Sequence, residues 1–424
     1  MPPAPVPVKR RRVFYIPGYD PIHPRRYREL YRKEGAAQAM ITGYDLTLKP
    51  KQAGGPYGWH VEATIDGQKT QTDFEVLIWS DIVRDSMGRS IPATYRQLVQ
   101  TSWAYISSGA LFGLMRLRKG PIIAALYPIV MLLAQALVGV LAGWAVAALI
   151  LCALPDFPFD GLVGFGLTAL VLILTLNWFH QNDSIFYAYY LMHDYAFSAQ
   201  SQGAYPPALE TRIAAFGNSI ATALTEPWDE VLVIGHSSGA HLAISILADL
   251  IRQNRIPAFF WRKYSGGLGA APPASSAPAL GLLSLGQVVP MVSYLPRADR
   301  LRADLHDLST HPELTWVDVT APGDGCAFAL CDPVAVSGVA PKGKRWPLVI
   351  SAAFSQSLSP ERWRTLRWRF FRLHFQYICA FDRPRDYDYF QITAGPQTLA
   401  DRYKDRAPSK SRIERATNRF TSRA

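Results

Sequence analysis

Short apolar runs alternate with amphipathic or polar stretches along most of this chain, and one far longer apolar stretch interrupts the alternation before the midpoint. Short apolar runs bounded by glycine, proline or polar clusters are typical of buried strands, and amphipathic stretches are typical of helices that cover a sheet. Their alternation predicts an α/β fold, with a mainly parallel sheet flanked by helices. The expected strands are 13–16, 38–48, 58–65, 72–83, 231–234, 314–319 and 348–354, the expected helices are 25–34, 92–117, 207–224 and 240–247, and a Gly-, Ala-, Pro- and Ser-rich loop is expected at 265–278.

The long apolar stretch spans residues 121–180, which contain no lysine or arginine and two aspartates. Its runs 121–154 and 162–179 each match or exceed the roughly 18 residues that cross a bilayer. Both runs are apolar on every face, whereas a helix that covers a soluble core needs only one apolar face. We therefore expect an inserted transmembrane helical hairpin at 120–180. A buried hairpin that forms a hydrophobic lid is the alternative.

Small residues and charges predict how this hairpin packs and how it is oriented. Gly139 and Gly143 form a G-x-x-x-G pattern, which allows two membrane helices to approach closely. Arg116, Arg118 and Lys119 precede the first run, and the turn between the runs carries only acids, so the positive-inside rule places the preceding segment in the cytoplasm. Two spans also keep both halves of the chain on one side. We expect both termini in the cytoplasm and the hairpin in a membrane such as the bacterial inner membrane.

The G-H-S-S-G motif at 235–239 is the strongest chemical signal in the chain. It lies between the apolar run 231–234 and a helix-like run, which is the strand–turn–helix context of a serine nucleophile elbow. Such a turn strains the backbone of Ser237, so the residues two positions away on both sides must be small. A glycine-rich turn without chemistry is the alternative, and His236 and His241 are expected to pack or to line the pocket. Besides the serine, the elbow consists of Gly235, His236, Ser238 and Gly239.

Residues further along the chain are candidates for the other two members of a catalytic triad. The expected strand 314–319 runs into a turn that presents Asp324, the candidate acid, with Asp332 and Asp318 as alternatives. His374 is the one histidine after Asp332 and follows the last expected strand, so it is the candidate base. A histidine in this role takes the serine proton and returns it to the leaving group, while the carboxylate fixes its tautomer.

Acyl transfer also needs hydrogen-bond donors for the oxyanion that forms during the reaction. The backbone N–H of Ser238, directly after the nucleophile, is one candidate. The backbone N–H of Tyr19 is the other, because it lies in a Pro-Gly turn that follows the expected strand 13–16. Gly18 allows the backbone to approach closely there, and an ordinary Pro-Gly turn is the alternative.

Together these features resemble the α/β-hydrolase superfamily of serine esterases, lipases and thioesterases. The resemblance rests on the elbow at 235–239, on the chain order Ser237, Asp324 and His374, and on the strand and turn at 13–19. It implies an α/β-hydrolase-like sheet and an acyl-enzyme mechanism, with no cofactor and no metal. It does not indicate a particular substrate.

The chain departs from the family pattern at its beginning and in its insertion. Twelve residues precede Val13, so the family's usual first two strands cannot lie upstream of the oxyanion strand. We expect the segments 38–48 and 58–65 to supply extra strands instead. The tail is expected to be disordered or to lie on the surface. The expected organisation is an N-terminal part of the hydrolase core at 1–119, the hairpin at 120–180, a C-terminal part of the core at 181–400 and a basic tail at 401–424.

The formal net charge of +11 suggests an anionic partner. Nucleic acid is one candidate, but the sequence contains no zinc-finger spacing or RNA-binding signature. Basic residues concentrate in 1–12, 25–33 and 402–423, and anionic lipid explains them better when a membrane hairpin is close by. We expect a membrane partner and no nucleic acid.

The four cysteines show no metal-ligand spacing, and Cys152 lies inside an expected span. Neither a metal site nor a disulfide framework is therefore expected. The N-terminus is basic and lacks an apolar core, so it is not expected to be a signal peptide.

The sequence thus predicts a membrane-anchored serine hydrolase that cleaves an acyl ester or thioester, with a lipid-like molecule as its substrate. The alternative belongs to another class: a non-catalytic membrane protein that uses a hydrolase scaffold for binding or assembly. Labelling by a fluorophosphonate probe separates the two, because it requires an activated serine.

Overall fold

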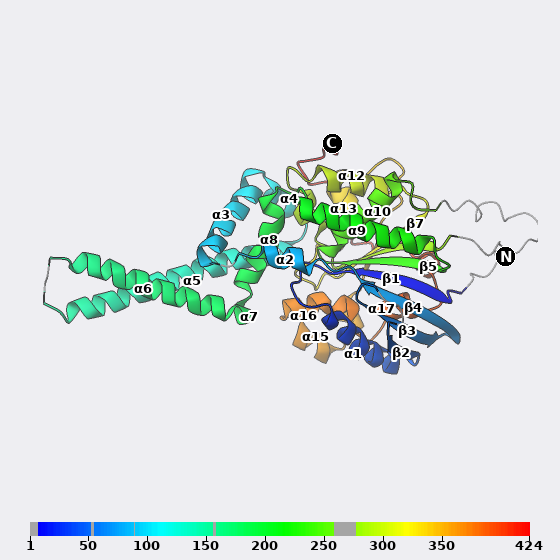
Figure 1. The fold of residues 1–424 in the computed structure, drawn as a ribbon, viewed down its shortest axis with the longest axis horizontal. Helices are drawn as coiled ribbons and strands as arrows, with labels where there is room; N and C mark the ends of the chain where they lie inside the picture. The colour runs from blue at the N-terminus through cyan, green and yellow to red at the C-terminus, as the bar shows by residue number, and fades with distance from the viewer. Residues whose placement is uncertain (1–6, 52–54, 89, 156–157, 258–276) are drawn as a thin grey trace, which may run out of the picture.

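An eight-stranded sheet forms the centre of the globular part, helices cover both of its faces, and two long helices project from one end (Figure 1). The computed structural model describes residues 7–51, 55–88, 90–155, 158–257 and 277–424. The strands are β1 (Arg10–Ile16), β2 (Asp45–Pro50), β3 (Gly58–Ile65), β4 (Gln68–Val76), β5 (Glu230–His236), β6 (Ala279–Leu285), β7 (Leu314–Thr320) and β8 (Leu348–Ser351).

The strand order across the sheet is β2-β3-β4-β1-β5-β6-β7-β8. All neighbours from β4 to β8 are parallel, and β2, β3 and β4 are antiparallel. β5 is buried along its whole length, as expected for a central parallel strand that helices cover on both faces. The register pairs Ile16 with Gly235 and His236 with Leu285, so β1, β5 and β6 end at one edge of the sheet. The turns that follow these strands therefore lie next to one another.

Helices form a layer on each face of the sheet. In Figure 1, α9, α10 and α12 lie above the sheet and α1, α15 and α16 lie below it, while α3 and α8 lie between the sheet and the projecting pair α5 and α6. The helices are α1 (Arg25–Thr42), α2 (Ser80–Ser86), α3 (Ile91–Ser107), α4 (Ala110–Leu114), α5 (Lys119–Cys152), α6 (Asp160–Gln181), α7 (Asp183–Phe186), α8 (Ala188–Gln200), α9 (Pro207–Leu224), α10 (Gly239–Arg252), α11 (Val289–Ser293), α12 (Asp299–Leu308), α13 (Pro333–Val336), α14 (Phe354–Ser357), α15 (Pro360–Leu366), α16 (Phe370–His374), the 3₁₀ helix η1 (Phe375–Ile378), α17 (Tyr389–Ala394) and α18 (Leu399–Arg402).

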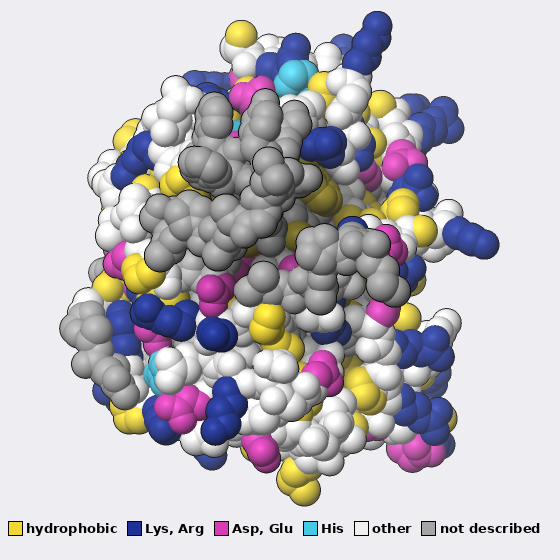
Figure 2. Space-filling model, turned by 90° about the vertical axis from the view of Figure 1, so that its right-hand side faces the viewer, with side chains coloured by type: hydrophobic (Ala, Val, Ile, Leu, Met, Phe, Trp, Pro, Cys, Tyr) yellow, Lys and Arg dark blue, Asp and Glu magenta, His cyan; other side chains and the backbone are white. Residues whose placement is uncertain are grey.

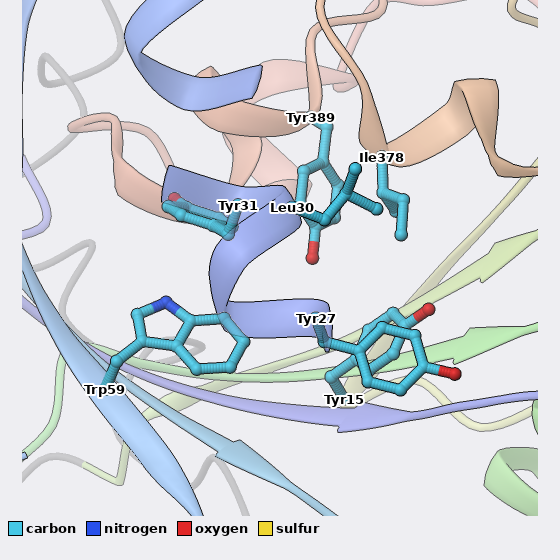
Figure 3. Close-up of a pocket in the computed structure, with 7 residues that line it drawn as sticks. All are labelled: Tyr15, Tyr27, Leu30, Tyr31, Trp59, Ile378 and Tyr389. Atoms are coloured by element: carbon cyan, nitrogen blue, oxygen red, sulfur yellow. The ribbon is translucent and has the colours of Figure 1, made fainter. Parts of the chain in front are cut away.

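Aromatic side chains hold α1 on the sheet (Figure 3). Tyr27 of α1 lies beside Tyr15 of β1, with ring centroids 5.0 Å apart, and Tyr31 meets Trp59 of β3 at 5.6 Å. Rings of this size contribute large buried areas and fix the geometry of the contact. The Tyr27 hydroxyl also donates to Asp20 Oδ2 at 2.6 Å, so the turn that connects β1 to α1 is fixed as well. The small pocket among these rings is lined by Tyr15, Tyr27, Leu30, Tyr31, Trp59, Ile378 and Tyr389.

The predicted α/β fold with a mainly parallel sheet and two inserted apolar helices is confirmed, and several element boundaries are wrong. The strand expected at 38–48 begins at Asp45, because α1 continues through good helix formers to Thr42 and ends at Gly43 with a φ of 76°. The strand expected at 72–83 ends at Val76, and its last residues belong to α2.

One further expected helix is wrong, one strand was not expected, and another expected helix is confirmed. The helix expected at 92–117 is two helices, α3 and α4, because Gly109 adopts a φ of 76° between them. β6 was not expected, since its leucine-rich sequence does not distinguish a buried strand from a helix. The helix expected at 207–224 is confirmed as α9. Most of the loop expected at 265–278 lies outside the described residues.

α5 and α6 are long and apolar enough to cross a membrane, and they pack against each other. The G-x-x-x-G pattern lies at their contact: a Cβ at Gly139 would lie 2.7 Å from Leu172 Cδ1, and a Cβ at Gly143 would lie 2.6 Å from Thr168 O. The absence of side chains at both glycines lets the two backbones approach. Residues 156 and 157 of the connecting turn lie outside the described residues.

The tail after Arg402 is ordered and lies along the surface of the globular part, which is the second of the two states expected for it. Ile413 forms a β-bridge with Cys331, and its carbonyl accepts the Asp332 N–H at 2.9 Å. The Thr417 hydroxyl lies 2.7 Å from the Tyr294 hydroxyl. These tertiary hydrogen bonds hold a polar segment that has no apolar pattern of its own.

Candidate active site

Ser237 lies on the sharp turn between β5 and α10. Its φ is 56°, in the left-handed region that residues other than glycine rarely adopt. A Cβ at Gly235 would lie 2.6 Å from Ala240 Cα. A Cβ at Gly239 would lie 2.1 Å from Ile16 O. Only glycine fits at these two positions, and the half-buried Ser237 side chain remains accessible.

His374 and Asp324 form a buried pair near this turn. His374 Nδ1 lies 2.8 Å from Asp324 Oδ2, which also accepts the Tyr377 hydroxyl at 3.0 Å. Asp324 Oδ1 accepts the backbone N–H of Cys326 at 2.9 Å. The other ring nitrogen of His374, Nε2, is buried and has no partner among the described residues. Nε2 is therefore the atom that is free to receive a proton.

The two alternative acids have other partners. Asp332 Oδ1 accepts two backbone N–H groups at the start of α13, each at 3.0 Å, and its Oδ2 pairs with Lys344 Nζ at 2.5 Å. Asp318 accepts the Ser284 hydroxyl at 2.5 Å, and burial raises the pKa of Asp318 to about 8. Asp332 therefore caps a helix, and Asp318 is a protonated core residue at neutral pH.

Charge and burial act in opposite directions on the His374–Asp324 pair. Burial alone would lower the pKa of His374, but the Asp324 carboxylate outweighs it and raises that pKa above its usual value. Burial alone would raise the pKa of Asp324, but His374 and the hydrogen bonds from Cys326 and Tyr377 hold that pKa below its usual value. A carboxylate that stays ionised in this position stabilises an imidazolium on His374.

His236 connects the elbow to His374, which is more than the packing role expected for it. Its Nε2 lies 3.0 Å from the His374 carbonyl oxygen, its Nδ1 lies 3.1 Å from the Tyr15 hydroxyl, and the two imidazole rings stack with centroids 5.0 Å apart. Burial, followed by the charge of His374, lowers the pKa of His236 to about 3. The neutral ring therefore donates from Nε2 and accepts at Nδ1. These contacts place His374 against the residue that precedes Ser237, although no hydrogen bond between Ser237 Oγ and His374 Nε2 is formed among the described residues. His241 is buried packing, as expected.

The turn after β1 lies against the serine. A Cβ at Gly18 would lie 2.9 Å from Ser237 Cβ, so a side chain at this position would collide with the elbow. Within the described part of the chain, the backbone N–H groups of Tyr19 and Ser238 donate to no acceptor. The structure thus brings together both residues expected to provide oxyanion donors.

Two aromatic residues from other elements fix this turn. Trp79 Nε1 donates to the Pro17 carbonyl at 2.9 Å, and the Tyr190 hydroxyl donates to the Tyr19 carbonyl at 2.5 Å. Trp79 directly precedes α2, and Tyr190 belongs to α8, which follows the apolar helices in the chain. No sequence motif indicated either contact.

The apolar helix pair begins directly beside the turn that carries Asp324. A Cβ at Gly120, in the first turn of α5, would lie 3.2 Å from Gly325 Cα. Arg118, just before α5, donates from Nε to the Ala329 carbonyl at 2.8 Å. Since α8 holds the other side of the site through Tyr190, the elements before and after the helix pair both contact it.

Asp194 of α8 is a third carboxyl group near the pair that sequence reasoning missed. It interacts electrostatically with His374 and with Tyr19, and it makes no hydrogen bond to any residue in the described ranges. Burial raises the pKa of Asp194 to about 7, against the lowering influence of His374.

Asp324, Cys326 and His374 place ligand atoms within 4.8 Å of one another, which is close enough for a metal ion. A thiol binds metal as thiolate, but burial and the nearby Asp324 and Asp194 carboxylates raise the pKa of Cys326 well above its usual value. Asp324 and His374 are also already bonded to each other. The arrangement suits proton transfer better than metal binding, and the expectation of no metal stays a prediction.

No family model, no curated protein and no solved structure matches the chain. The structure itself defines an α/β protein with a mixed, mostly parallel eight-stranded sheet and two inserted apolar helices. The chemistry of the site is therefore argued from its own geometry.

Proposed function

We propose that this protein is a membrane-anchored serine hydrolase of the α/β-hydrolase type that cleaves an acyl ester or thioester. One observation carries the proposal: Ser237 is strained into a half-buried turn whose preceding residue, His236, packs on the buried His374–Asp324 pair. Gly18 packs against Ser237 from the turn after β1, where a side chain would collide with the serine. Backbone strain at non-glycine residues clusters at active sites, which supports a functional role for Ser237.

In the proposed reaction Ser237 Oγ attacks the acyl carbon while His374 Nε2 removes its proton. That proton passes from His374 to the leaving alcohol or thiol, and an acyl ester on Ser237 remains. Water then gives a proton to the same nitrogen and attacks the acyl ester, and the proton returns to Ser237 as the acid leaves. Asp324 holds the ring with Nε2 free and stabilises its charged form.

The oxyanion formed at each step would be bound by the backbone N–H groups of Tyr19 and Ser238. Such donors help most when they are fixed before the reaction starts, and loss of one donor costs about 10²–10³ in rate. The bonds from Trp79 to the Pro17 carbonyl and from Tyr190 to the Tyr19 carbonyl supply this rigidity.

The membrane anchor in this proposal is the pair α5 and α6. In the most apolar 18-residue window of α6 no residue is buried, and 22% of the corresponding window of α5 is buried, whereas a core helix of a soluble protein is mostly buried. On the face away from the helix pair, the hydrophobic side chains that can be seen are scattered among charged ones (Figure 2). Most of the exposed large hydrophobic side chains in the described residues lie between Val99 and Tyr187, on and beside the helix pair, which supports its insertion into a membrane.

Labelling with an alkyl fluorophosphonate tests the proposal in purified full-length protein. Wild type should be labelled and should hydrolyse a short soluble ester, and Ser237→Ala should lose both by several orders of magnitude. Ser219→Ala, at a serine on α9 away from the site, is the matched control and should behave as wild type. Absence of labelling in folded wild type would favour the non-catalytic alternative, in which the scaffold only binds or assembles.

A further inference from the structure

A segment rich in arginine and aromatic residues lies directly before His374. Residues 361–372 contain five arginines and one glutamate, and they span most of α15 and α16. This segment is not one of the three basic stretches considered above. Its half-buried Trp363 packs on the turn that carries Asp324, since a Cβ at Gly323 would lie 2.5 Å from Trp363 Cη2. The turn of the candidate acid therefore holds the segment on the globular part.

Most of the positive charge in this segment is not neutralised by ion pairs. Arg362 pairs with Glu34 of α1 at 3.6 Å, and Arg364 pairs with Glu361 at 3.4 Å. The other three arginines are exposed and form no ion pair with any residue that the structure describes: Arg367, Arg369 and Arg372. A guanidinium group binds phosphate through two parallel hydrogen bonds. The segment therefore offers three free groups to an anionic partner.

Exposed aromatic rings accompany these arginines. Trp368 is 71% exposed and Phe370 is 50% exposed. The Arg367 guanidinium lies over the Trp368 ring, 5.5 Å from its centroid. Arginine together with tryptophan and phenylalanine is typical of protein surfaces at the boundary between lipid headgroups and acyl chains, where the charge stays with the headgroups and the ring enters the apolar region. The composition of this surface thus fits a lipid bilayer.

The segment contacts the apolar helix pair at both ends that meet the globular part. Phe370 packs on Gly325, which also lies against Gly120 in the first turn of α5. Phe371 meets Tyr187, the residue that follows α7, with ring centroids 4.7 Å apart. Figure 1 shows α16 close to α7, at the end of the globular part from which the pair projects. With α5 and α6 in a bilayer, the segment therefore lies at the level of the headgroups.

We propose that residues 361–372 form a surface that binds anionic phospholipid headgroups beside the candidate active site. The three arginines without ion pairs bind the phosphates, and Trp368 and Phe370 enter the outer edge of the apolar region. The inference rests on the membrane insertion proposed for α5 and α6 and is independent of catalysis. Nucleic acid also fits arginines, but it gives no reason for their position at the base of two apolar helices.

Lipid binding to full-length protein in nonionic detergent micelles tests this surface. Native mass spectrometry gives the Kd of dioleoyl phosphatidylglycerol and that of dioleoyl phosphatidylcholine, which has the same chains and no net charge. Wild type should bind the anionic lipid about tenfold more tightly or better, since each arginine at an anionic lipid surface contributes about fivefold. Salt at about 0.5 M should remove most of this preference by screening the charges.

A triple variant and a matched control show where the preference originates. The test variant carries Arg367→Gln, Arg369→Gln and Arg372→Gln, and its preference should fall to about twofold or less. The control removes the same charge from exposed residues at the opposite edge of the sheet, where β4 and β8 begin: Lys69→Gln, Lys342→Gln and Arg345→Gln. It should keep the wild-type preference, and a thermal melt shows that both variants are folded.

A test variant that keeps the wild-type preference, or a control that loses it equally, would overturn the surface. Hydrogen exchange of wild type needs no variant: the amides of 361–372 should exchange more slowly in phosphatidylglycerol nanodiscs than in phosphatidylcholine nanodiscs, and equal exchange would contradict the proposal. A single-stranded oligonucleotide that binds wild type more tightly than the anionic lipid does, and no longer binds the test variant, would make nucleic acid the partner instead. A full-length protein that stays soluble without detergent would refute the membrane anchor itself, which is a separate result.

Discussion

Replacement of Asp324 by asparagine examines the site most directly. Asp324 is 2% exposed, so water cannot replace what it contributes. The amide oxygen of asparagine can still accept the Cys326 N–H. Its NH₂ group, however, would take the place of Oδ2, which now accepts hydrogen bonds from His374 Nδ1 and from the Tyr377 hydroxyl. His374 would then carry its proton on Nε2, the nitrogen that must take the serine proton.

The expected loss for Asp324→Asn follows from this tautomer change. A carboxylate-to-amide change at this position costs about 10⁴ in turnover, which corresponds to about 5.5 kcal/mol at 1.36 kcal/mol per tenfold. The assay is kcat/KM for a short soluble ester, together with a thermal melt to show that the protein stays folded.

Asp332→Asn is the matched control, because the substitution is the same and the residue is equally buried. It weakens the bond to Lys344 and the cap of α13, so it should lower stability by about 1–3 kcal/mol while leaving kcat/KM nearly unchanged. If Asp332→Asn abolishes turnover and Asp324→Asn does not, the assignment of the acid is wrong.

Three other predictions concern charge, packing and topology. Asp194→Asn removes a charge that raises the pKa of His374, so the acid limb of the kcat/KM profile should move to lower pH; a limb that stays or moves upward contradicts the contact. Gly143→Leu should lower the melting temperature in micelles, since its side chain would meet Thr168 and overpacking costs about 1–3 kcal/mol, whereas Gly166→Leu meets nothing within 4 Å and should not. Accessibility tags at both termini should report the cytoplasm and a tag in 155–161 the opposite side; termini on opposite sides would exclude the two-span arrangement.

Local chemistry made part of this site predictable from sequence. The elbow requires small residues at fixed positions around Ser237, so its motif can be found in the sequence. His374 could be selected because it is the one histidine after Asp332. The contacts of His236, Asp194 and Tyr190 could not be predicted, because they join segments more than a hundred residues from their partners. The sequence also could not show which aspartate bonds to His374, because this depends on how two turns fold.

The predicted ends of helices and strands are wrong where local propensity and tertiary contacts favour different elements. The segment 38–48 contains both the end of α1 and the start of β2, and only Gly43, which is left-handed, and Tyr44 separate them. The tail after Arg402 has no periodic pattern, because its order comes from hydrogen bonds to Tyr294 and to Cys331 and its neighbours.

The pairing of β1 with β5 has a consequence for biosynthesis. β1 lies before the apolar helices in the chain and β5 lies after them, yet the two strands are neighbours at the centre of the sheet. If α5 and α6 insert into a membrane as proposed, they leave the ribosome and reach it while β1 still has an open, apolar edge. Unpaired edges of this kind are prone to aggregation during synthesis. In the proposed membrane-anchored protein, the edge of β1 therefore stays unpaired until β5 is synthesised and completes the centre of the sheet.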